Sequence, residues 1–516
     1  MSNFLNALKT ETNYTYTENG AVTHKTTMSN LLDMFAMGAA MRQRSDEDVI
    51  LMFKKAFEED ATYALKCLFY IRDVRGGQGE RRFFRVCTKW LATNHTDYMK
   101  RNLKYVPEYG RWDDLYVFVG TPLEADAFEI IKEQLALDCE CKTPSLLAKW
   151  LKSENTSSAK SRTLGDMTRR YLGMTHKQYR KTLSILRERI NVLERLMSAG
   201  EWDKIEFDKI PSRAGMIYKN AFARHDLERV QAQPDAITYE AFVKDTTTKV
   251  NAKALYPYEC VYEASKIMDC DAWWQKNRPA LDNIERLAIN KYWDNLADYF
   301  QNAELNAMAV VDTSGSMTMG STKAQLPINV AISLGMYCAE KANGPFHGHY
   351  ISFSSRPQLI EIEGVDFCDK VARIYETNLC QNTNIEATFD LVLNTAIQNR
   401  MKQEDLPEKL IIISDMEFDS ARGYYNYSWN GYNNPPAQET LMEGIERKWN
   451  AHGYKMPELV YWNVNARQNN IPMTAKNGVM FVSGMSPSIF EQIMHNKDAF
   501  SLMMDVLNKE RYAPIQ

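Results

Sequence analysis

The sequence predicts a chain in two structural parts, a helical N-terminal half and a C-terminal α/β domain with a doubly wound parallel sheet. Up to about residue 300 apolar residues recur at spacings of three and four, whereas beyond it short apolar runs alternate with helical stretches. At 516 residues the chain is also too long for one ordinary core. We therefore expect an N-terminal extension over residues 1–30, a helical domain over 31–300 and an α/β domain over 301–516.

The helical half begins with a capping signal. Ser45 precedes a run in which Asp48 lies at the third helical position, and Val49, Met52 and Phe53 share a face. No fixed sequence period links the helices, so the 34-residue repeat families are not supported and any helical repeat is an inference from geometry. Similar amphipathic stretches follow at 80–92, 95–106, 111–119, 122–138, 143–153, 176–198, 213–223, 235–248 and 256–268.

The C-terminal part contains five apolar runs that suit parallel strands buried on both faces. They are NAMAVVD (306–312), GHYISFS (348–354), KLIIISD (409–415), PELVYWNV (457–464) and GVMFVSG (478–484). Amphipathic helices are expected at 322–341, 384–400, 437–451 and 487–507. In such sheets ligands bind beyond the carboxyl ends of the strands, which directs attention to the residues after the first strand.

Asp312, Ser314 and Ser316 form a D-x-S-x-S motif directly after that strand. Alternating residues of an extended loop project to the same side, so three oxygen ligands can converge on one hard cation. Thr383 precedes a predicted helix and Asp415 ends a predicted strand, both at the same edge of the sheet. Two carboxylates and three hydroxyls suit Mg²⁺ or Mn²⁺ and leave the metal able to accept an acidic ligand. The alternative for the serines is a tight turn that caps the next helix.

Two further acidic residues, Glu417 and Asp419, follow Asp415. They could extend the cluster into a nuclease-like two-metal site, but we expect surface charges on the loop. No general base or nucleophile is evident, because the histidines are dispersed and His347 and His349 lie at the start of a predicted strand. We therefore expect no enzymatic activity. The stretch YYNYSWNGYNNPP (424–436) is either a lid over the metal site or a passive insertion.

The ordered set of D-x-S-x-S, Thr383 and Asp415 resembles the metal-ion-dependent adhesion site of von Willebrand factor A domains. The resemblance implies a Rossmann-type sheet. It also implies that Ser314, Ser316 and Thr383 coordinate the cation directly or nearly so, while Asp312 and Asp415 act largely through water. We expect such a metal to accept an acidic protein side chain or a phosphate.

Charge is segregated along the chain. The net charge is −4, yet residues 142–224 hold 18 Lys and Arg against 8 Asp and Glu, and residues 72–104 hold 9 against 3. This excess points to an anionic partner for the N-terminal half. The nine scattered cysteines are typical of reduced thiols, and the sequence contains neither a membrane span nor a signal region. We expect a cytoplasmic monomer with no membrane partner.

Two basic stretches carry the candidate RNA contacts. Residues 70–90 combine a glycine-rich turn with arginines that could hold phosphates, or form an inter-helix turn beside a solvated basic face. Residues 209–226 interleave basic residues with Tyr218 and Phe222, which could stack on bases or lie in the core. The candidates are Arg72, Arg75, Arg81, Arg82, Arg85, Arg213, Lys219 and Arg224.

The stretches RDVRGGQGER, LLAKWL, IPSRAGMIYKNAF and ALYPYE, followed by VVDTSGSM and IISDMEFD, resemble an uncharacterised family related to the Ro autoantigen. In Ro proteins a ring of HEAT-like helical repeats, the TROVE module, is closed by a von Willebrand factor A domain. The resemblance covers roughly residues 30–510 and implies a helical ring or arch in a ribonucleoprotein. It implies small non-coding RNAs on a basic outer surface and single-stranded ends of misfolded RNAs in a central hole. The alternative is a Mg²⁺-dependent protein assembly or adhesion scaffold without RNA.

Overall fold

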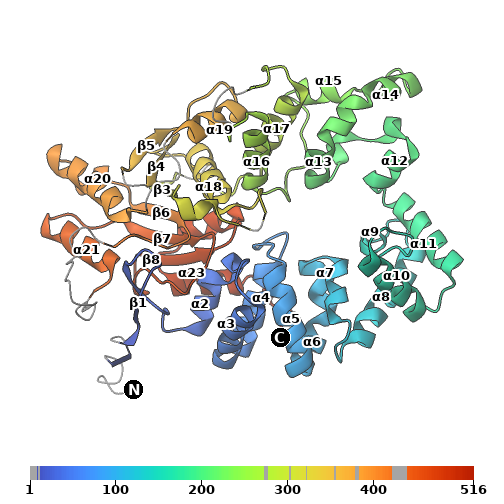
Figure 1. The fold of residues 1–516 in the computed structure, drawn as a ribbon, viewed down its shortest axis with the longest axis horizontal. Coiled ribbons are helices and arrows are strands. Elements are labelled where there is room, and N and C mark those ends of the chain that lie inside the picture. Colours follow the sequence, from blue (N-terminus) through green and yellow to red (C-terminus); the bar gives the residue numbers. More distant parts are fainter. Residues whose placement is uncertain are drawn as a thin grey trace, which may run out of the picture. The chain divides into compact units, whose positions relative to one another are not determined.

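The computed structural model describes residues 8–9, 12–271, 277–301, 304–320, 322–353, 356–377, 383–420 and 439–516. The predicted lid or insertion at 424–436 lies outside these ranges. The chain forms two compact units, whose elements are labelled in Figure 1. The α/β unit comprises residues 1–67 and 255–511, and the helical unit comprises 68–254 and 512–516. The domain boundaries near residues 30 and 300 stay a prediction.

The sheet of the α/β unit has six strands in the order β5-β4-β3-β6-β7-β8. All five predicted strands are present and parallel, which confirms the predicted sheet as mostly parallel. They are β3 (Ala307–Asp312), β4 (His349–Phe353), β6 (Lys409–Ser414), β7 (Glu458–Asn463) and β8 (Val479–Ser483). The edge strand β5 (Gln358–Glu361) pairs antiparallel with β4, and it was not predicted because three of its four residues are exposed.

Strand order reverses between β3 and β6. From β3 the chain proceeds to β4 and β5 on one side, and then returns to β6 on the other side of β3. The carboxyl ends of β3 and β6 therefore flank the switch point at which open α/β sheets bind ligands. Asp312 is the last residue of β3, and Asp415 follows the last residue of β6.

Helices of the α/β unit pack against this sheet (Figure 1). Helix α18 (Pro327–Lys341) packs against β3, β4 and β6, and is buried from its first residue to Ala339. Helix α20 (Ile385–Gln398) contacts β4 and α21 (Leu441–Ala451). The other helices of eight or more residues are α2 (Asn30–Met37), α3 (Asp46–Glu59), α16 (Pro257–Ile267), α17 (Ile284–Asp294), α19 (Phe367–Glu376) and α23 (Ala499–Leu507).

Capping explains several helix boundaries. Ser45 accepts a hydrogen bond from the Asp48 N–H at 3.1 Å, as predicted for the start of α3. The helix expected over 487–507 is interrupted, because Asp498 caps a new helix, α23, by accepting from the Ser501 N–H at 2.9 Å. The shorter helix before it is α22 (Phe490–His495).

The N-terminal segment pairs with the α/β unit through a short hairpin. Strands β1 (Tyr14–Tyr16) and β2 (Val22–His24) are antiparallel, and the turn between them contains Gly20 at φ +86°. His24 exchanges backbone hydrogen bonds with Ile471, at 3.0 and 2.9 Å. These bonds attach the hairpin to the segment that follows β7.

The described residues of the helical unit contain helices and no strand, as expected for this half. The predicted helices are present with shifted ends, except that the helix expected over 176–198 is divided in two and the one expected over 111–119 is a 3-10 helix (Trp112–Phe118). Helices α10 and α14 were not predicted. Whether these helices form HEAT-like repeats in a ring stays a prediction. The helices are α5 (Arg82–Asn94), α6 (Thr96–Asn102), α7 (Val106–Tyr109), α8 (Glu124–Glu140), α9 (Leu147–Trp150), α10 (Ala159–Tyr171), α11 (His176–Arg189), α12 (Leu193–Ala199), α13 (Ser212–Arg224), α14 (Asp226–Ala232) and α15 (Tyr239–Lys244).

Helix α4 (Ala61–Arg72) contains the boundary between the two units.

Within the described ranges, no helix has both the length and the apolar character that crossing a lipid bilayer requires.

Candidate metal centre and basic surface

Asp312 is fixed at the carboxyl end of β3 by two hydrogen bonds. Its Oδ1 accepts from the Ser314 N–H at 2.9 Å, and its Oδ2 accepts from the Ser414 hydroxyl at 2.6 Å. The side chain is fully buried. Since Ser414 belongs to β6, this contact joins the two strands that flank the switch point.

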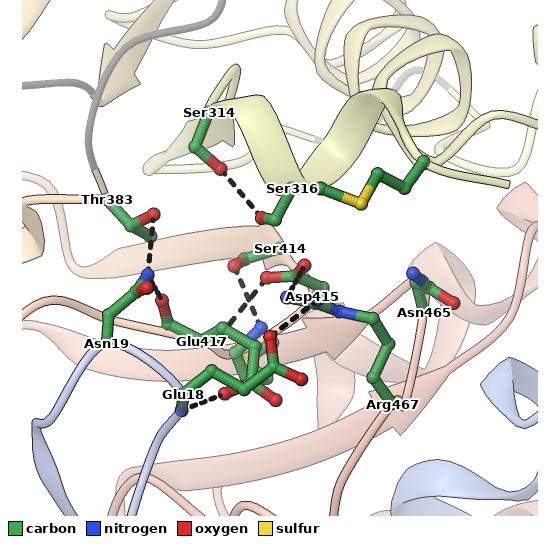
Figure 2. Close-up of polar contacts among 12 residues, drawn as sticks. Glu18, Asn19, Ser314, Ser316, Thr383, Ser414, Asp415, Glu417, Asn465 and Arg467 are labelled. Carbon is green, nitrogen blue, oxygen red and sulfur yellow. Dashed lines mark hydrogen bonds and ion pairs between the residues drawn. The ribbon is translucent and has the colours of Figure 1, made fainter. Parts of the chain in front are cut away.

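The two motif serines lie side by side in the loop after β3. Their Oγ atoms are 3.1 Å apart. Figure 2 draws this contact as a dashed line. Ser314 is the N-cap residue of a short 3-10 helix (Gly315–Thr318) that contains Ser316. Ser314 is buried and Ser316 is half-buried. The turn expected from these small residues is thus present, and it directs both hydroxyls to one side.

Thr383 and Asp415 complete the predicted set (Figure 2). Thr383 is buried ahead of α20, and its carbonyl accepts from the Asp419 N–H at 2.9 Å. Asp415 is 1% exposed, and its Oδ1 accepts from the Glu417 N–H at 3.2 Å. Met416, between these two carboxylates, has φ +65°, a strained backbone for a residue with a side chain. The loop after β6 therefore has an energetically unfavourable backbone conformation at the site.

The structure places Glu417 at this site instead of at the surface. The side chain is fully buried, which corrects the expectation of a surface charge, and Asp419 is half-buried. Glu417 Oε2 accepts from the Glu18 N–H at 2.7 Å, while no described residue donates a hydrogen bond to Oε1. A buried carboxylate oxygen without a donor is unfavourable unless a cation lies near it.

The hairpin turn between β1 and β2 reaches the same site. Asn19 Nδ2 donates to the Glu417 carbonyl at 2.6 Å and to the Thr383 hydroxyl at 3.4 Å. Thr17 donates its hydroxyl to the Phe418 carbonyl at 2.6 Å. No sequence signal pointed to these contacts, because they join residues about 400 positions apart.

Arg467 is a further residue of the site that sequence reasoning missed. It lies in the segment after β7, with Nη2 3.2 Å from Asp415 Oδ2 and Nη1 2.6 Å from Glu18 Oε2 (Figure 2). Its guanidinium therefore links the hairpin turn to the carboxylates of the centre.

The electrostatics of the centre are dominated by buried negative charge. Burial, and then the charge of Asp415, raises the pKa of Asp312, and burial also raises the pKa of Asp415. Burial, followed by repulsion from Asp415 and Glu18, raises the pKa of Glu417 to about 7. One guanidinium, that of Arg467, opposes this charge. An all-oxygen set with excess negative charge fits a hard divalent cation, and Asp312, Ser314, Ser316, Thr383 and Asp415 could hold it.

A second acidic group lies in the helical unit. Single ligand atoms of Glu154, Asp166 and His176 lie within 4.8 Å of one another. Arg169 pairs with both carboxylates, at 2.9 Å from Glu154 and 2.6 Å from Asp166. A guanidinium already occupies the position that a metal would need, so this group is an ion-pair network.

The predicted RNA-contact residues differ in exposure. Arg72 is 1% exposed and donates to Asp114 at 2.9 and 2.7 Å. Lys219 is 4% exposed and donates to the Met216 carbonyl at 3.2 Å. Both lie inside the helical unit, so their burial contradicts the expectation that they contact RNA. Of the remaining candidates, Arg82 and Arg85 are half-buried, and the exposed ones are Arg75, Arg81, Arg213 and Arg224.

Two features expected to approach RNA are internal. A Cβ on Gly77 would lie 2.0 Å from the Tyr70 carbonyl oxygen, so this glycine permits close approach to α4 and not to a phosphate. Phe222 is 2% exposed, and its ring lies 5.6 Å from that of Phe207 and 5.3 Å from that of Tyr239. Phe222 is therefore a core residue, which was the alternative to base stacking that the sequence left open.

Together the fold and the site define a class: a protein with a helical unit and a von Willebrand factor A-like sheet that carries hydroxyls and carboxylates at its switch point. Residues 17–145 and 133–304 match a domain of unknown function (DUF2828), and residues 306–512 match another (DUF7788). The Uncharacterized protein L728 of Acanthamoeba polyphaga mimivirus is 30% identical, over 98% of this chain and 89% of its own length. The chain belongs to this uncharacterised DUF2828 family.

A solved structure is also similar to the chain. The crystal structure of the Deinococcus radiodurans RO (RSR) protein aligns with 94% of this chain and 100% of its own, at 14% identity and a TM-score of 0.44. The family models and the viral relative confirm the predicted membership of an uncharacterised family.

Proposed function

We propose that the chain is a non-enzymatic RNA-binding protein that holds small or misfolded non-coding RNA on the basic surface of its helical unit. The charge of that unit carries the proposal. It has 33 Lys and Arg against 25 Asp and Glu, although acidic residues outnumber basic ones, 66 to 62, in the whole chain. A cationic unit within an acidic protein favours a polyanionic partner at that unit.

Helix α13 supplies the clearest contact surface. Arg213, Ile217, Asn220 and Arg224 are all exposed, at spacings of four, three and four. They form one solvent-facing stripe, with the two guanidiniums about 16 Å apart along the helix axis. The stripe can contact the phosphate backbone without reading base sequence, which suits binding to varied RNAs.

In the α/β unit we propose that Asp312, Ser314, Ser316, Thr383 and Asp415 hold Mg²⁺ or Mn²⁺. The hydroxyls coordinate the cation, and the aspartates balance its charge. Glu417 Oε1, buried without a donor among the described residues, supports a cation at this position. The free cysteines among the described residues support a reducing, cytoplasmic location, where the chain acts as a monomer.

Filter binding with structured and single-stranded RNA tests the RNA proposal. The affinity of the wild type should fall steeply between about 50 and 200 mM salt. The double variant Arg213→Glu and Arg224→Glu should bind more weakly. A control with the same charge change uses Lys55→Glu and Lys497→Glu, two exposed lysines of the α/β unit, and should bind as the wild type. Failure of the wild type to bind either RNA at low salt would overturn the proposal.

The second candidate function is a Mg²⁺-dependent assembly scaffold, which the convergence of five oxygen-bearing side chains at one sheet edge favours. It predicts a protein partner that is lost both on EDTA treatment and in Asp312→Ala, with RNA binding absent. Retention of the partner under both treatments would exclude a role for the metal centre in assembly.

A further inference from the structure

Two adjacent carboxylates, Asp113 and Asp114, lie at the centre of a group of cationic side chains in the helical unit. Arg85 Nη2 lies 2.6 Å from Asp114 Oδ1 and 3.4 Å from Asp113 Oδ2, so it bridges the two. Arg72 donates two hydrogen bonds to Asp114 Oδ2. The group, called here the cationic cluster, consists of Arg72, Arg81, Arg85, Arg111, Lys152, Asp113 and Asp114.

Arg111 and Lys152 form the other side of the cluster. Arg111 Nε and Nη2 donate to the two oxygens of Asp113 at 3.1 and 3.2 Å. Its guanidinium also stacks on Trp150, 4.1 Å from the ring centroid. Lys152 Nζ lies 3.6 Å from Asp113 Oδ2. The contacts with Asp113 and Trp150 fix the orientation of the Arg111 guanidinium before any ligand binds.

The cluster has more cations than its carboxylates can neutralise. Both oxygens of Asp113 and of Asp114 already have cationic partners. Arg81 has no hydrogen bond or ion pair to its side chain within the described ranges. Although Arg81 is exposed, partial desolvation, followed by repulsion from Arg85 and Arg111, lowers its pKa from the ordinary value. The residue before Arg81, Glu80, accepts a hydrogen bond from the Arg82 N–H at 2.8 Å.

Apart from the buried Arg72, the cations of the cluster face the solvent, while its carboxylates lie beneath them. The side chains of Arg85, Arg111 and Lys152 are 27%, 26% and 28% exposed, whereas Asp113 is 8% and Asp114 0% exposed. An anion that approaches from water therefore meets guanidinium and ammonium groups first. Charge-assisted hydrogen bonds are stronger in such partly desolvated surroundings.

We propose that the cationic cluster binds a phosphate monoester, with Arg81, Arg85, Arg111 and Lys152 as its ligands. The five cations exceed the two carboxylates by three charges, which suits a dianion better than a singly charged diester. A terminal phosphate carries about −1.5 to −2 at pH 7. The identity of the phosphate rests on the proposed function: we take it to be the phosphorylated end of an RNA strand. The cluster holds this end while the α13 stripe contacts the internal phosphates of the same strand.

The test compares short single-stranded RNAs that carry a 5′ phosphate, a 3′ phosphate or hydroxyls at both ends. Binding is measured by fluorescence anisotropy in EDTA, so that the metal centre does not take up phosphate. At least one phosphorylated strand should bind about tenfold more tightly, as expected for one or two charge-assisted hydrogen bonds. Arg81→Gln should abolish this preference. Arg213→Gln is the matched control, and it should weaken all strands while keeping the preference.

A second experiment tests the phosphate site without RNA. The unfolding temperature is measured in inorganic phosphate and, as a control, in chloride at equal ionic strength, both with EDTA present. Phosphate should stabilise the wild type and not Arg81→Gln. If no RNA binds but this stabilisation is seen, the phosphate site stands and the RNA function fails. If all strands bind equally and phosphate does not stabilise the protein, the RNA function stands and the proposed site is wrong.

Discussion

Three carboxylates lie buried together at the candidate metal centre, those of Asp312, Asp415 and Glu417, and Arg467 brings one guanidinium to them. The first two could be predicted from the sequence because they follow strand ends in a known order of ligands. The burial of Glu417 could not, since an acidic residue in a loop is ordinarily solvated and its burial depends on the hairpin turn that covers it. Arg72 and Lys219 show the same limit, because the packing of the helical unit decides whether a basic residue is buried.

The burial of Glu417 leads to a prediction with two parts. Glu417→Gln removes one of three buried charges, so the metal-free protein should become more stable, by about 1 kcal/mol. The affinity for Mg²⁺ should fall about tenfold, because the same charge no longer attracts the cation. Thermal unfolding in EDTA and across a Mg²⁺ titration measures both effects.

Glu133→Gln is the control for this change, since Glu133 is exposed in the helical unit. It should alter neither quantity. If Glu417→Gln gives the same Mg²⁺ titration as the wild type, Glu417 does not contribute to cation binding.

Among the elements, α21 shows how the hairpin is tied to the α/β unit. Thr440 and Glu443 form a capping box at its N-terminus, with the Thr440 N–H donating to Glu443 at 2.8 Å. His24 Nε2, on β2, lies 3.6 Å from the same carboxylate. Burial alone would raise the pKa of Glu443, but the nearby His24 imidazole and the hydrogen bonds from Thr440 outweigh it and lower the pKa to about 2.

The lowered pKa of Glu443 predicts that part of the folding stability is lost in acid. Because the pKa of Glu443 is lower in the folded chain than its ordinary value of 4.5, its charge stabilises the fold above pH 4.5. That contribution is lost as the pH falls from 4.5 towards 2. Glu443→Gln keeps the capping hydrogen bond and removes the charge, so urea unfolding at pH 6 and pH 3 isolates it. The stability difference between wild type and variant should shrink at pH 3, and an equal difference at both pH values would contradict the assignment.

Elements with a regular apolar pattern were predictable. The five parallel strands are buried along nearly their whole length, so their apolar runs are continuous. The exposed edge strand β5 and the three-residue strands β1 and β2 carry no such pattern. The hairpin is fixed by backbone pairing with Ile471, a contact between distant residues that no local pattern encodes.

At the scale of the whole molecule, charge distinguishes the two units. The helical unit has an excess of eight basic residues, and the α/β unit has 29 Lys and Arg against 41 Asp and Glu. This separation was visible in the sequence as basic stretches, but which basic residues reach the surface was not. RNA at the helical unit and a cation in the α/β unit are the two ligands that this distribution favours.

The salt dependence of RNA binding tests the central claim most directly. The slope of log affinity against log salt counts the phosphates that the protein neutralises. The claim predicts a linear decrease for the wild type, and a slope smaller by about two in the double variant Arg213→Gln and Arg224→Gln, since each arginine contacts one phosphate. An unchanged slope in the variant, or no RNA binding by the wild type, would contradict it.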